Sequence, residues 1–357
     1  MSRPTRLFAI SAAVLLLAGC AAAPDAAAPG AKGGSDAASN FCARMVTNSG
    51  GLKDRSFNQS SWEGLEKAAA KYSINAEVLV STSETDLSPN VDQAVASGCS
   101  LILTVGYELA SATSEQAAAN PKIDFAIVDE VVEGANIKPI VFDTAQAAYL
   151  AGYLAAGVSK TGVVATFGGG NQPPVTLFMD GFVDGVAKYN EVHGTAVKAL
   201  GWDKVRQDGS FTGDFEDLNK GKALAASFIE QGADVILPVA GQVGEGAAAA
   251  AIDAGGVSLI WVDNDGYETL PAEYRPILLT SVLKNTGDAV NEIVAASMDN
   301  SFDNAAFIGT LGNGGVDLAP FHDLAGTVSA ELQTELDQLR ADIISGSVMV
   351  SSPSTPK

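Results

Sequence analysis

Residues able to make directed contacts with a ligand gather between Val46 and Leu65, in V-T-N-S-G-G-L-K-D-R-S-F-N-Q-S-S-W-E-G-L. The charged and polar side chains of this stretch can donate or accept hydrogen bonds, and Phe57 can stack on a flat ring. An apolar run precedes the two glycines and an amphipathic pattern follows them, which predicts a strand, a loop and a helix. Side chains of such a loop lie at the carboxyl edge of a parallel sheet, where open α/β folds bind small ligands. Asp54 or Ser56 is suited to cap the helix, and an ordinary strand-to-helix turn with one core aromatic is the alternative.

Polar residues also end three later apolar runs. Asp129 ends A-I-V-D, Asp263 ends I-W-V-D, and Lys284 ends T-S-V-L-K. Carboxylates accept hydrogen bonds and an ammonium group donates them, so these residues are suited to a polar ligand. A cap for the following element is the alternative role of Asp129. Asp263 and Asp265 share a loop, but two acids alone more often serve as caps or ligand acceptors, so we expect no metal site.

Strand-like and helix-like segments alternate from Cys42 to about Phe142. The predicted strands are 42–47, 76–80, 101–105, 124–128 and 139–142, and the predicted helices lie near 59–72, 87–97 and 109–119. This alternation predicts a parallel sheet with right-handed crossovers.

A second unit of the same kind starts near Ala147 with a helix rich in small residues. The following strands are predicted at 163–170, 196–202, 234–239 and 260–263, and the helices at 176–189, 217–231 and 244–254. The three glycines of 168–170 lack the spacing of a nucleotide-binding loop, so we expect a tight turn there. The expected fold class is α/β, with two lobes of ordinary domain size.

Taken in order, these blocks resemble the basic membrane protein family, the substrate-binding lipoproteins of ABC importers typified by purine nucleoside receptor A. The first loop of that family typically reads D-x-G-G-x-x-D-K-S-F-N-Q-x-x-W-E-G. This chain supplies Gly50, Gly51, Asp54, Ser56, Phe57, Asn58, Gln59, Trp62, Glu63 and Gly64. Asn48 stands where the family usually has an acid, and Arg55 replaces a lysine while keeping its charge. The similarity covers nearly the whole chain after residue 40.

The resemblance implies a type I periplasmic-binding-protein-like fold, with two doubly wound parallel-sheet lobes joined by a three-strand hinge. The N-terminal lobe would comprise 41–145 plus 281–307, and the C-terminal lobe 146–280 plus 308–357. The segments 278–301 and 307–318 would cross between the lobes, and a helix at 329–344 would close the fold. Such a hinge suits closure of the lobes on a ligand.

The same resemblance places four residues against the flat base of a nucleoside. Phe57 and Phe178 would stack on its two faces. Asn58 and Asp129 would read the base edge, with the carboxylate accepting hydrogen bonds from N–H groups.

Three further residues would hold the sugar of the same ligand. Asp263 would accept hydrogen bonds from the ribose hydroxyls, and Lys284 would donate to them. Gly241 would let the backbone approach the sugar, although Gln242-Val243 departs from the usual pair that follows. The selectivity for a particular ligand therefore stays open.

By this resemblance the protein would capture a small polar metabolite, foremost a purine nucleoside, and deliver it to an ABC transporter permease. A sensory lipoprotein of the same fold, or a sugar or other non-nucleoside ligand, is the alternative. We expect no enzyme and no cofactor, because neither His193 nor His322 stands near another catalytic element. No G-x-S-x-G, H-E-x-x-H or C-x-x-C motif occurs, which leaves a hydrolase or a Rossmann-type dehydrogenase as remote alternatives. Because the chain has 42 acidic and only 21 basic residues, nucleic acid is not an expected partner.

The start of the chain has the pattern of a lipoprotein signal peptide. In residues 1–20, two arginines precede a short apolar run, and L-A-G-C then matches a lipobox that ends at Cys20. Cys20 is therefore the predicted lipidation site, with an uncleaved anchor or a plain secretory signal as the alternative. Residues 21–40 carry no large apolar side chain and are predicted to be a disordered tether. The expected location is the extracytoplasmic face of the cell membrane, held there by the lipid anchor.

The two remaining cysteines precede or open predicted strands. Cys42 opens the first strand, and Cys99 stands just before the strand at 101–105. In a doubly wound sheet these strands would be parallel neighbours, with both cysteines at the same amino-terminal edge. A Cys42–Cys99 disulfide suits this geometry and an oxidising compartment, and two buried free thiols are the alternative.

Overall fold

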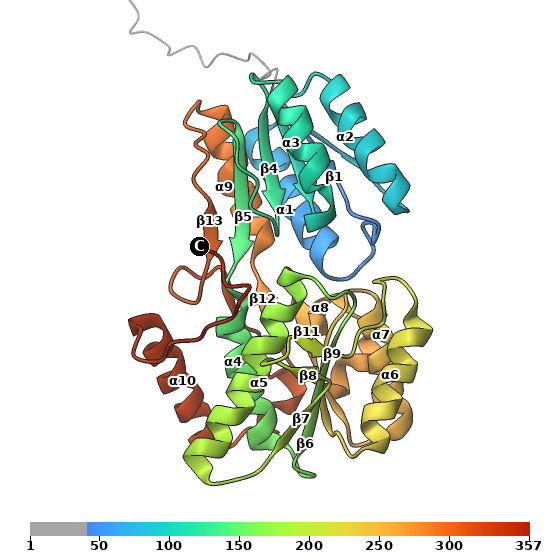
Figure 1. The fold of residues 1–357 in the computed structure, drawn as a ribbon, viewed down its shortest axis with the longest axis vertical. Coiled ribbons are helices and arrows are strands. Elements are labelled where there is room, and N and C mark those ends of the chain that lie inside the picture. Colours follow the sequence, from blue (N-terminus) through green and yellow to red (C-terminus); the bar gives the residue numbers. More distant parts are fainter. Residues whose placement is uncertain (1–40) are drawn as a thin grey trace, which may run out of the picture. The chain divides into compact units, whose positions relative to one another are not determined.

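The computed structural model describes residues 41–357, so the predicted signal peptide, the tether and Cys20 lie outside the described part. The first lobe contains the strands β1 (Cys42–Val46), β2 (Asn75–Leu79), β3 (Leu101–Val105), β4 (Asp124–Val128), β5 (Ile137–Phe142) and β13 (Phe307–Gly309). Its helices are α1 (Phe57–Tyr72), α2 (Leu87–Ala96), α3 (Ala110–Ala119) and α9 (Thr286–Met298). Figure 1 shows this lobe above the second one.

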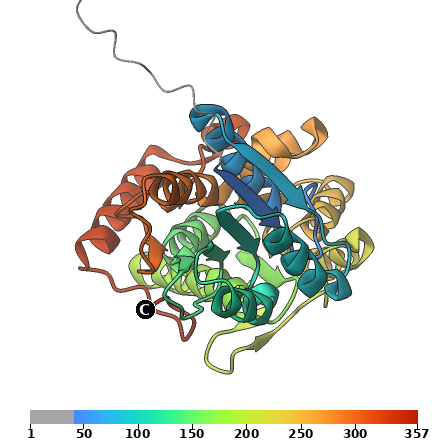
Figure 2. The same cartoon turned by 90° about the horizontal axis from the view of Figure 1, so that it is seen from above.

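The sheet of the first lobe has the strand order β13-β5-β4-β3-β1-β2, and all neighbouring strands are parallel. Every residue of β3 is buried, because helices cover both faces of the sheet. Leu103 packs into a cluster with residues of α1 and α9, whereas its neighbour Ile102 packs with residues of α2 and α3. Seen from above, the strands lie between these two layers of helices (Figure 2).

The second lobe repeats this arrangement. Its sheet consists of β6 (Val163–Gly168), β7 (Lys198–Leu200), β10 (Val235–Val239), β11 (Ser258–Asp263), β12 (Leu278–Lys284) and β14 (Val316–Leu318). Its helices are α4 (Thr144–Val158), α5 (Pro173–His193), α6 (Leu218–Glu230), α7 (Val243–Ala254), α8 (Gly266–Thr269) and α10 (Ala330–Ser345). The strand order is β14-β12-β11-β10-β6-β7, and β14 alone runs antiparallel to its neighbour. The predicted α/β fold with two doubly wound lobes is therefore confirmed.

Glycines explain why α4 is so rich in small residues. A Cβ atom added to Gly152 of α4 would lie 2.0 Å from the carbonyl oxygen of Phe182 on α5. A Cβ atom on Gly185 of α5 would lie 2.0 Å from the carbonyl oxygen of Tyr149 on α4. The two helices thus pack backbone against backbone, which larger side chains would prevent.

One predicted strand is shorter than expected. In place of a strand over 196–202, β7 covers only Lys198–Leu200, because Gly201 adopts a φ of 89° and turns the chain. The chain then forms a small antiparallel pair from β8 (Trp202–Asp203) and β9 (Asp208–Gly209).

Three connections link the lobes. They lie between Phe142 and Thr144, between Lys284 and Thr286, and between Gly309 and Val316. The boundary expected at residue 281 falls inside β12, which stays in the second sheet because it pairs with β11 and β14 up to Lys284. Lys284 therefore belongs to the second lobe and stands at the start of a crossing.

A disulfide joins Cys42 and Cys99 in the first lobe. β1 and β3 are parallel neighbours, and the two Cα atoms lie 4.8 Å apart at the edge of the sheet where both strands begin. The bond closes a loop between residues that are 57 positions apart in the sequence. A disulfide of this kind constrains the unfolded chain and so favours the folded state.

Candidate ligand-binding site

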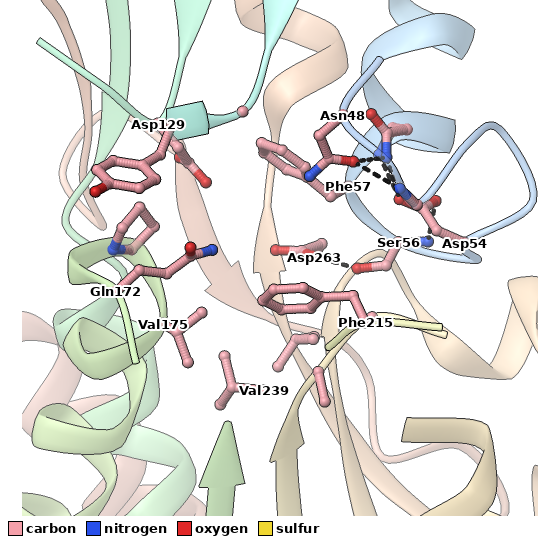
Figure 3. A pocket seen from close by; sticks show the side chains of 18 of the residues that line it. Asn48, Asp54, Ser56, Phe57, Asp129, Gln172, Val175, Phe215, Val239 and Asp263 are labelled. Carbon is pink, nitrogen blue, oxygen red and sulfur yellow. Dashed lines mark hydrogen bonds between the residues drawn. The ribbon is translucent and has the colours of Figure 1, made fainter. Parts of the chain in front are cut away.

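A cleft lies between the carboxyl edges of the two sheets (Figure 3). Open α/β folds bind small ligands at this edge of their sheets, so the cleft is the candidate ligand site. All seven ligand-binding residues predicted from the sequence line it, namely Phe57, Asn58, Asp129, Phe178, Gly241, Asp263 and Lys284.

The loop that precedes α1 is organised by one buried carboxylate. Asp54 accepts hydrogen bonds from the backbone N–H groups of Ser56 (3.1 Å), Asn58 (2.7 Å) and Gln59 (3.1 Å). Of the two cap candidates, Asp54 therefore satisfies the first turn of the helix, whereas the Ser56 side chain makes no capping bond. Burial raises the pKa of Asp54 to about 6, although these hydrogen bonds lower it.

The amide orientation of Asn58 is fixed by its neighbours. Its Nδ2 atom donates to Asn48 Oδ1 at 2.7 Å and to Asp54 Oδ2 at 3.0 Å. Both partners are acceptors, so the nitrogen must face them and the oxygen must face away. Asn58 Oδ1 is buried and has no hydrogen-bond partner within residues 41–357.

A lysine stands between two strand-end aspartates in the cleft. Lys284 Nζ lies 2.5 Å from Asp129 Oδ2 and 3.7 Å from Asp263 Oδ1, and it sits 4.4 Å from the centre of the Phe57 ring. Only 3% of the Lys284 side chain is exposed. Burial lowers the pKa of Lys284, but the two carboxylates outweigh it and hold the pKa above its usual value. Burial raises the pKa of Asp129, and Lys284 opposes that rise.

Further contacts join the first loop to the second lobe. The Ser56 hydroxyl donates a hydrogen bond to the carboxylate of Asp263. Asn264 Nδ2 donates to the Ser56 carbonyl at 2.9 Å, and Trp261 Nε1 donates to the Arg55 carbonyl at 3.4 Å. These bonds hold the loop of one lobe against the strand end of the other.

Comparison with known proteins identifies the family. Residues 42–353 match the family model Bmp, described as ABC transporter substrate-binding protein PnrA-like. The chain belongs to this family.

Curated members of the Bmp family are similar along most of their length. The chain is 31% identical to the ABC transporter nucleoside-binding protein BmpA of Lactococcus lactis subsp. cremoris, over 97% of this chain and 99% of that protein. It is 28% identical to basic membrane protein A of Borreliella burgdorferi, over 85% of this chain and 86% of that protein. The resemblance drawn from the first loop is thereby confirmed.

Solved structures show the same fold. An ABC transporter solute-binding protein from Aeropyrum pernix K1 superposes with a TM-score of 0.78 at 22% sequence identity, covering 88% of this chain and 94% of that one. As a member of the Bmp family, the protein is a substrate-binding component of an ABC transporter.

The aromatic residues that line the cleft of this Bmp protein differ in part from the two that were predicted from the sequence. Phe57 lines the cleft as predicted, but Phe178 is 2% exposed and packs mainly in the core. Phe215, which sequence reasoning missed, also lines the cleft, and Figure 3 shows it across Asp263 from Phe57. It lies in a polar loop before α6. No apolar periodicity surrounds it, so the sequence pattern does not indicate where its ring lies.

Four polar residues of the cleft were also missed. They are Ser56, Tyr107, Glu108 and Gln172. Ser56 was predicted as a candidate cap and as part of the family motif, but not as a ligand contact. The other three follow or precede elements without any motif, and only the approach of the two lobes brings them together.

No set of three or more His, Cys, Asp or Glu side chains is placed to hold a metal ion within residues 41–357. No helix in that part of the chain combines the length and the apolar character needed to cross a bilayer.

Proposed function

We propose that this protein binds a purine nucleoside between its lobes and delivers it to an ABC importer. The observation that carries the proposal is the buried Asp129–Lys284–Asp263 group beside Phe57 in the cleft. A nucleoside has a flat base, which can stack on the Phe57 ring. It also has a sugar diol, which can donate hydrogen bonds to the carboxylates and accept one from the lysine. The nucleoside-binding relative from Lactococcus supports this ligand class.

The base would lie at the first-lobe side of the cleft. Phe57 stacks on one face, and Phe178 or the newly found Phe215 forms the other wall. Asn58 offers its free Oδ1 to a base N–H group. Asp129 offers its carboxylate to the same edge. Loss of a stacking ring costs about 1–3 kcal/mol of binding free energy for bases on aromatic platforms.

The sugar would lie against the second lobe. Asp263 accepts from the ribose hydroxyls and Lys284 donates to them. Gly241 adopts a φ of 51°, and a Cβ atom there would lie 3.9 Å from Phe215 as the nearest neighbour. The open space at this glycine gives the sugar access to the backbone.

The proposal also includes binding without catalysis and attachment outside the cytoplasm. The Bmp family consists of ABC transporter substrate-binding proteins, which supports a role in capture and release. The lipobox at Cys20 supports a lipid anchor on the extracytoplasmic face of the membrane. The intact mass of membrane-extracted protein should show an acylated chain that begins at Cys20. A water-soluble mature chain that starts elsewhere would contradict the anchor.

Calorimetry on protein that has been unfolded, stripped of bound ligand and refolded tests the ligand class. Guanosine, inosine and adenosine should be tried beside ribose, free bases and riboflavin. Binding of at least one purine nucleoside, weakened about 5- to 150-fold by Phe57→Ala, is the expected result. Phe302→Ala, which replaces an aromatic residue of the first lobe that does not line the cleft, is the control. If all three nucleosides fail while a sugar or flavin binds, the nucleoside assignment is wrong and the fold assignment stands.

A further inference from the structure

Two acceptor atoms in the cleft lack partners. Among residues 41–357, four buried side-chain oxygens make no hydrogen bond, and two of them belong to cleft residues: Asn58 Oδ1 and Glu108 Oε2. A buried acceptor without a donor carries an unfavourable free energy, and more so when it is charged. Sites that leave acceptors free in this way are suited to ligands that bring the missing donors.

The backbone directs Glu108 into the cleft. Glu108 lies in a short 3-10 helix (Tyr107–Leu109) directly after β3, and Gly106 before it has a φ of 125°. A Cβ atom on Gly106 would lie 2.8 Å from Glu108 Oε2 and 3.0 Å from the Cβ atom of Asn48. The carboxyl group therefore folds back over Gly106 toward Asn48, whose Oδ1 accepts the Asn58 amide. Glu108 and Asn58 thus lie on the same wall of the cleft.

No cation of the cleft compensates Glu108. Lys284 is the cleft's lysine, and its contacts go to Asp129 and Asp263. Burial raises the pKa of Glu108 and the charge of Asp129 adds to that rise, while the side chain of Gln172 from the second lobe opposes it. In the described part of the chain this wall therefore presents two buried acceptors without partners, Asn58 Oδ1 and Glu108 Oε2.

We infer that Glu108 is a specificity-determining residue which, together with Asn58 Oδ1, selects nucleosides whose base edge carries two neighbouring N–H donors. The inference rests on the proposed function and narrows its ligand class to 2-amino-6-oxopurine nucleosides. The ring N–H and the 2-amino group of such a base form a pair of donors that a carboxylate and an amide oxygen can accept together. Inosine lacks the 2-amino group, and adenosine lacks the ring N–H.

Matched ligands test the inference without any mutation. Guanosine and inosine differ only in the 2-amino group, so calorimetry on the refolded wild-type protein should give guanosine about 10- to 100-fold tighter binding, as expected for a hydrogen bond to a charged group. Equal affinities would overturn the inference and leave the proposed function intact. Failure of every purine nucleoside to bind would overturn the proposed function, and the inference with it.

The variant Glu108→Gln tests whether Glu108 causes the preference for guanosine over inosine. Glu108→Gln keeps the size of the side chain and one acceptor oxygen but removes the charge, so it should bring guanosine binding close to that of inosine. Inosine binding should change by less than about threefold, because the inference pairs Glu108 with the 2-amino group, which inosine lacks, and Asn58 Oδ1 with the ring N–H, which inosine keeps. Glu130→Gln is the matched control, because Glu130 is an acid beside Asp129 that does not line the cleft. An unchanged guanosine-to-inosine ratio in a folded Glu108→Gln protein would overturn the inference.

Discussion

Asp129 and Asp263 occupy equivalent places in the two lobes. Asp129 follows β4 and Asp263 ends β11, and these strands hold the same position in their sheet orders. Both residues adopt a φ of 67°, a left-handed conformation that aspartate tolerates better than most residues. Their partners differ, because Asp129 lies 2.5 Å from Lys284, whereas Asp263 lies 3.7 Å from it and accepts the Ser56 hydroxyl. Both carboxylates thus contact the other lobe from the same local structure, Asp129 through the ammonium group of Lys284 and Asp263 through the hydroxyl of Ser56.

Removing the lysine between the two aspartates should have the largest effect. Lys284→Met leaves two buried carboxylates without their cation, which should lower the free energy of unfolding by about 3–5 kcal/mol and weaken nucleoside binding at least 100-fold. Urea unfolding and calorimetry measure the two quantities. Lys138→Met, which breaks a more exposed pair with Asp303, should cost no more than about 1 kcal/mol. Equal stability losses in the two variants would show that Lys284 does not hold the carboxylates together.

Asp54 is a third buried acid, and it forms no ion pair within residues 41–357, although Lys53 and Arg55 flank it in the sequence. The pKa of Asp54 is about 6 in the folded chain and near 3.8 in the unfolded chain, so the folded chain binds the proton more tightly. The stability gained from this proton is full below pH 4 and is lost as the pH rises through 6. The loss amounts to about 3 kcal/mol.

Urea unfolding between pH 4 and pH 7 measures this loss by comparison with Asp54→Asn, which has no proton to release. The free energy of unfolding of the wild-type protein, relative to that of the variant, should fall over this range. A difference that stays constant with pH would mean that Asp54 has the same pKa in both states.

Parallel substitutions test the two aspartates directly. Asparagine tolerates the left-handed backbone, so Asp129→Asn and Asp263→Asn remove charge with little backbone strain. Asp129→Asn should weaken nucleoside binding about 10- to 100-fold, because the closest partner of Lys284 loses its charge. Asp263→Asn should cost less than about tenfold, since its charge lies farther from the lysine. Equal losses in calorimetry would contradict the division of roles.

The sequence predicted the fold and part of the site for physical reasons that can be named. The apolar periodicity of a strand or helix depends only on residues close in the sequence, so the alternation of strands and helices in both lobes could be predicted. The order of the strands then predicted that Cys42 and Cys99 lie close together. Strand-end residues such as Asp129 and Asp263 could be placed because parallel strands end at one edge. Phe215 could not, since it reaches the cleft from an irregular loop whose path depends on tertiary packing. Glu108 also follows a strand, but no motif in G-Y-E-L marks it as a ligand contact.

The same limit applies to the lobe boundary near residue 281. The segment T-S-V-L-K reads as a strand in either lobe, and only its pairing with β11 and β14 assigns it to the second. Likewise, the early end of β7 depends on a turn at Gly201, whose φ of 89° no apolar period reveals.

The Cys42–Cys99 bond has a mechanical consequence. Tension that enters the folded part at the start of β1 can pass through the disulfide straight to the start of β3. The segment between the two cysteines, which includes the cleft loop and α1, then lies off the path of the load. A protein pulled from its amino-terminal end would in this way keep its binding loop unstretched while the covalent bond carries the force.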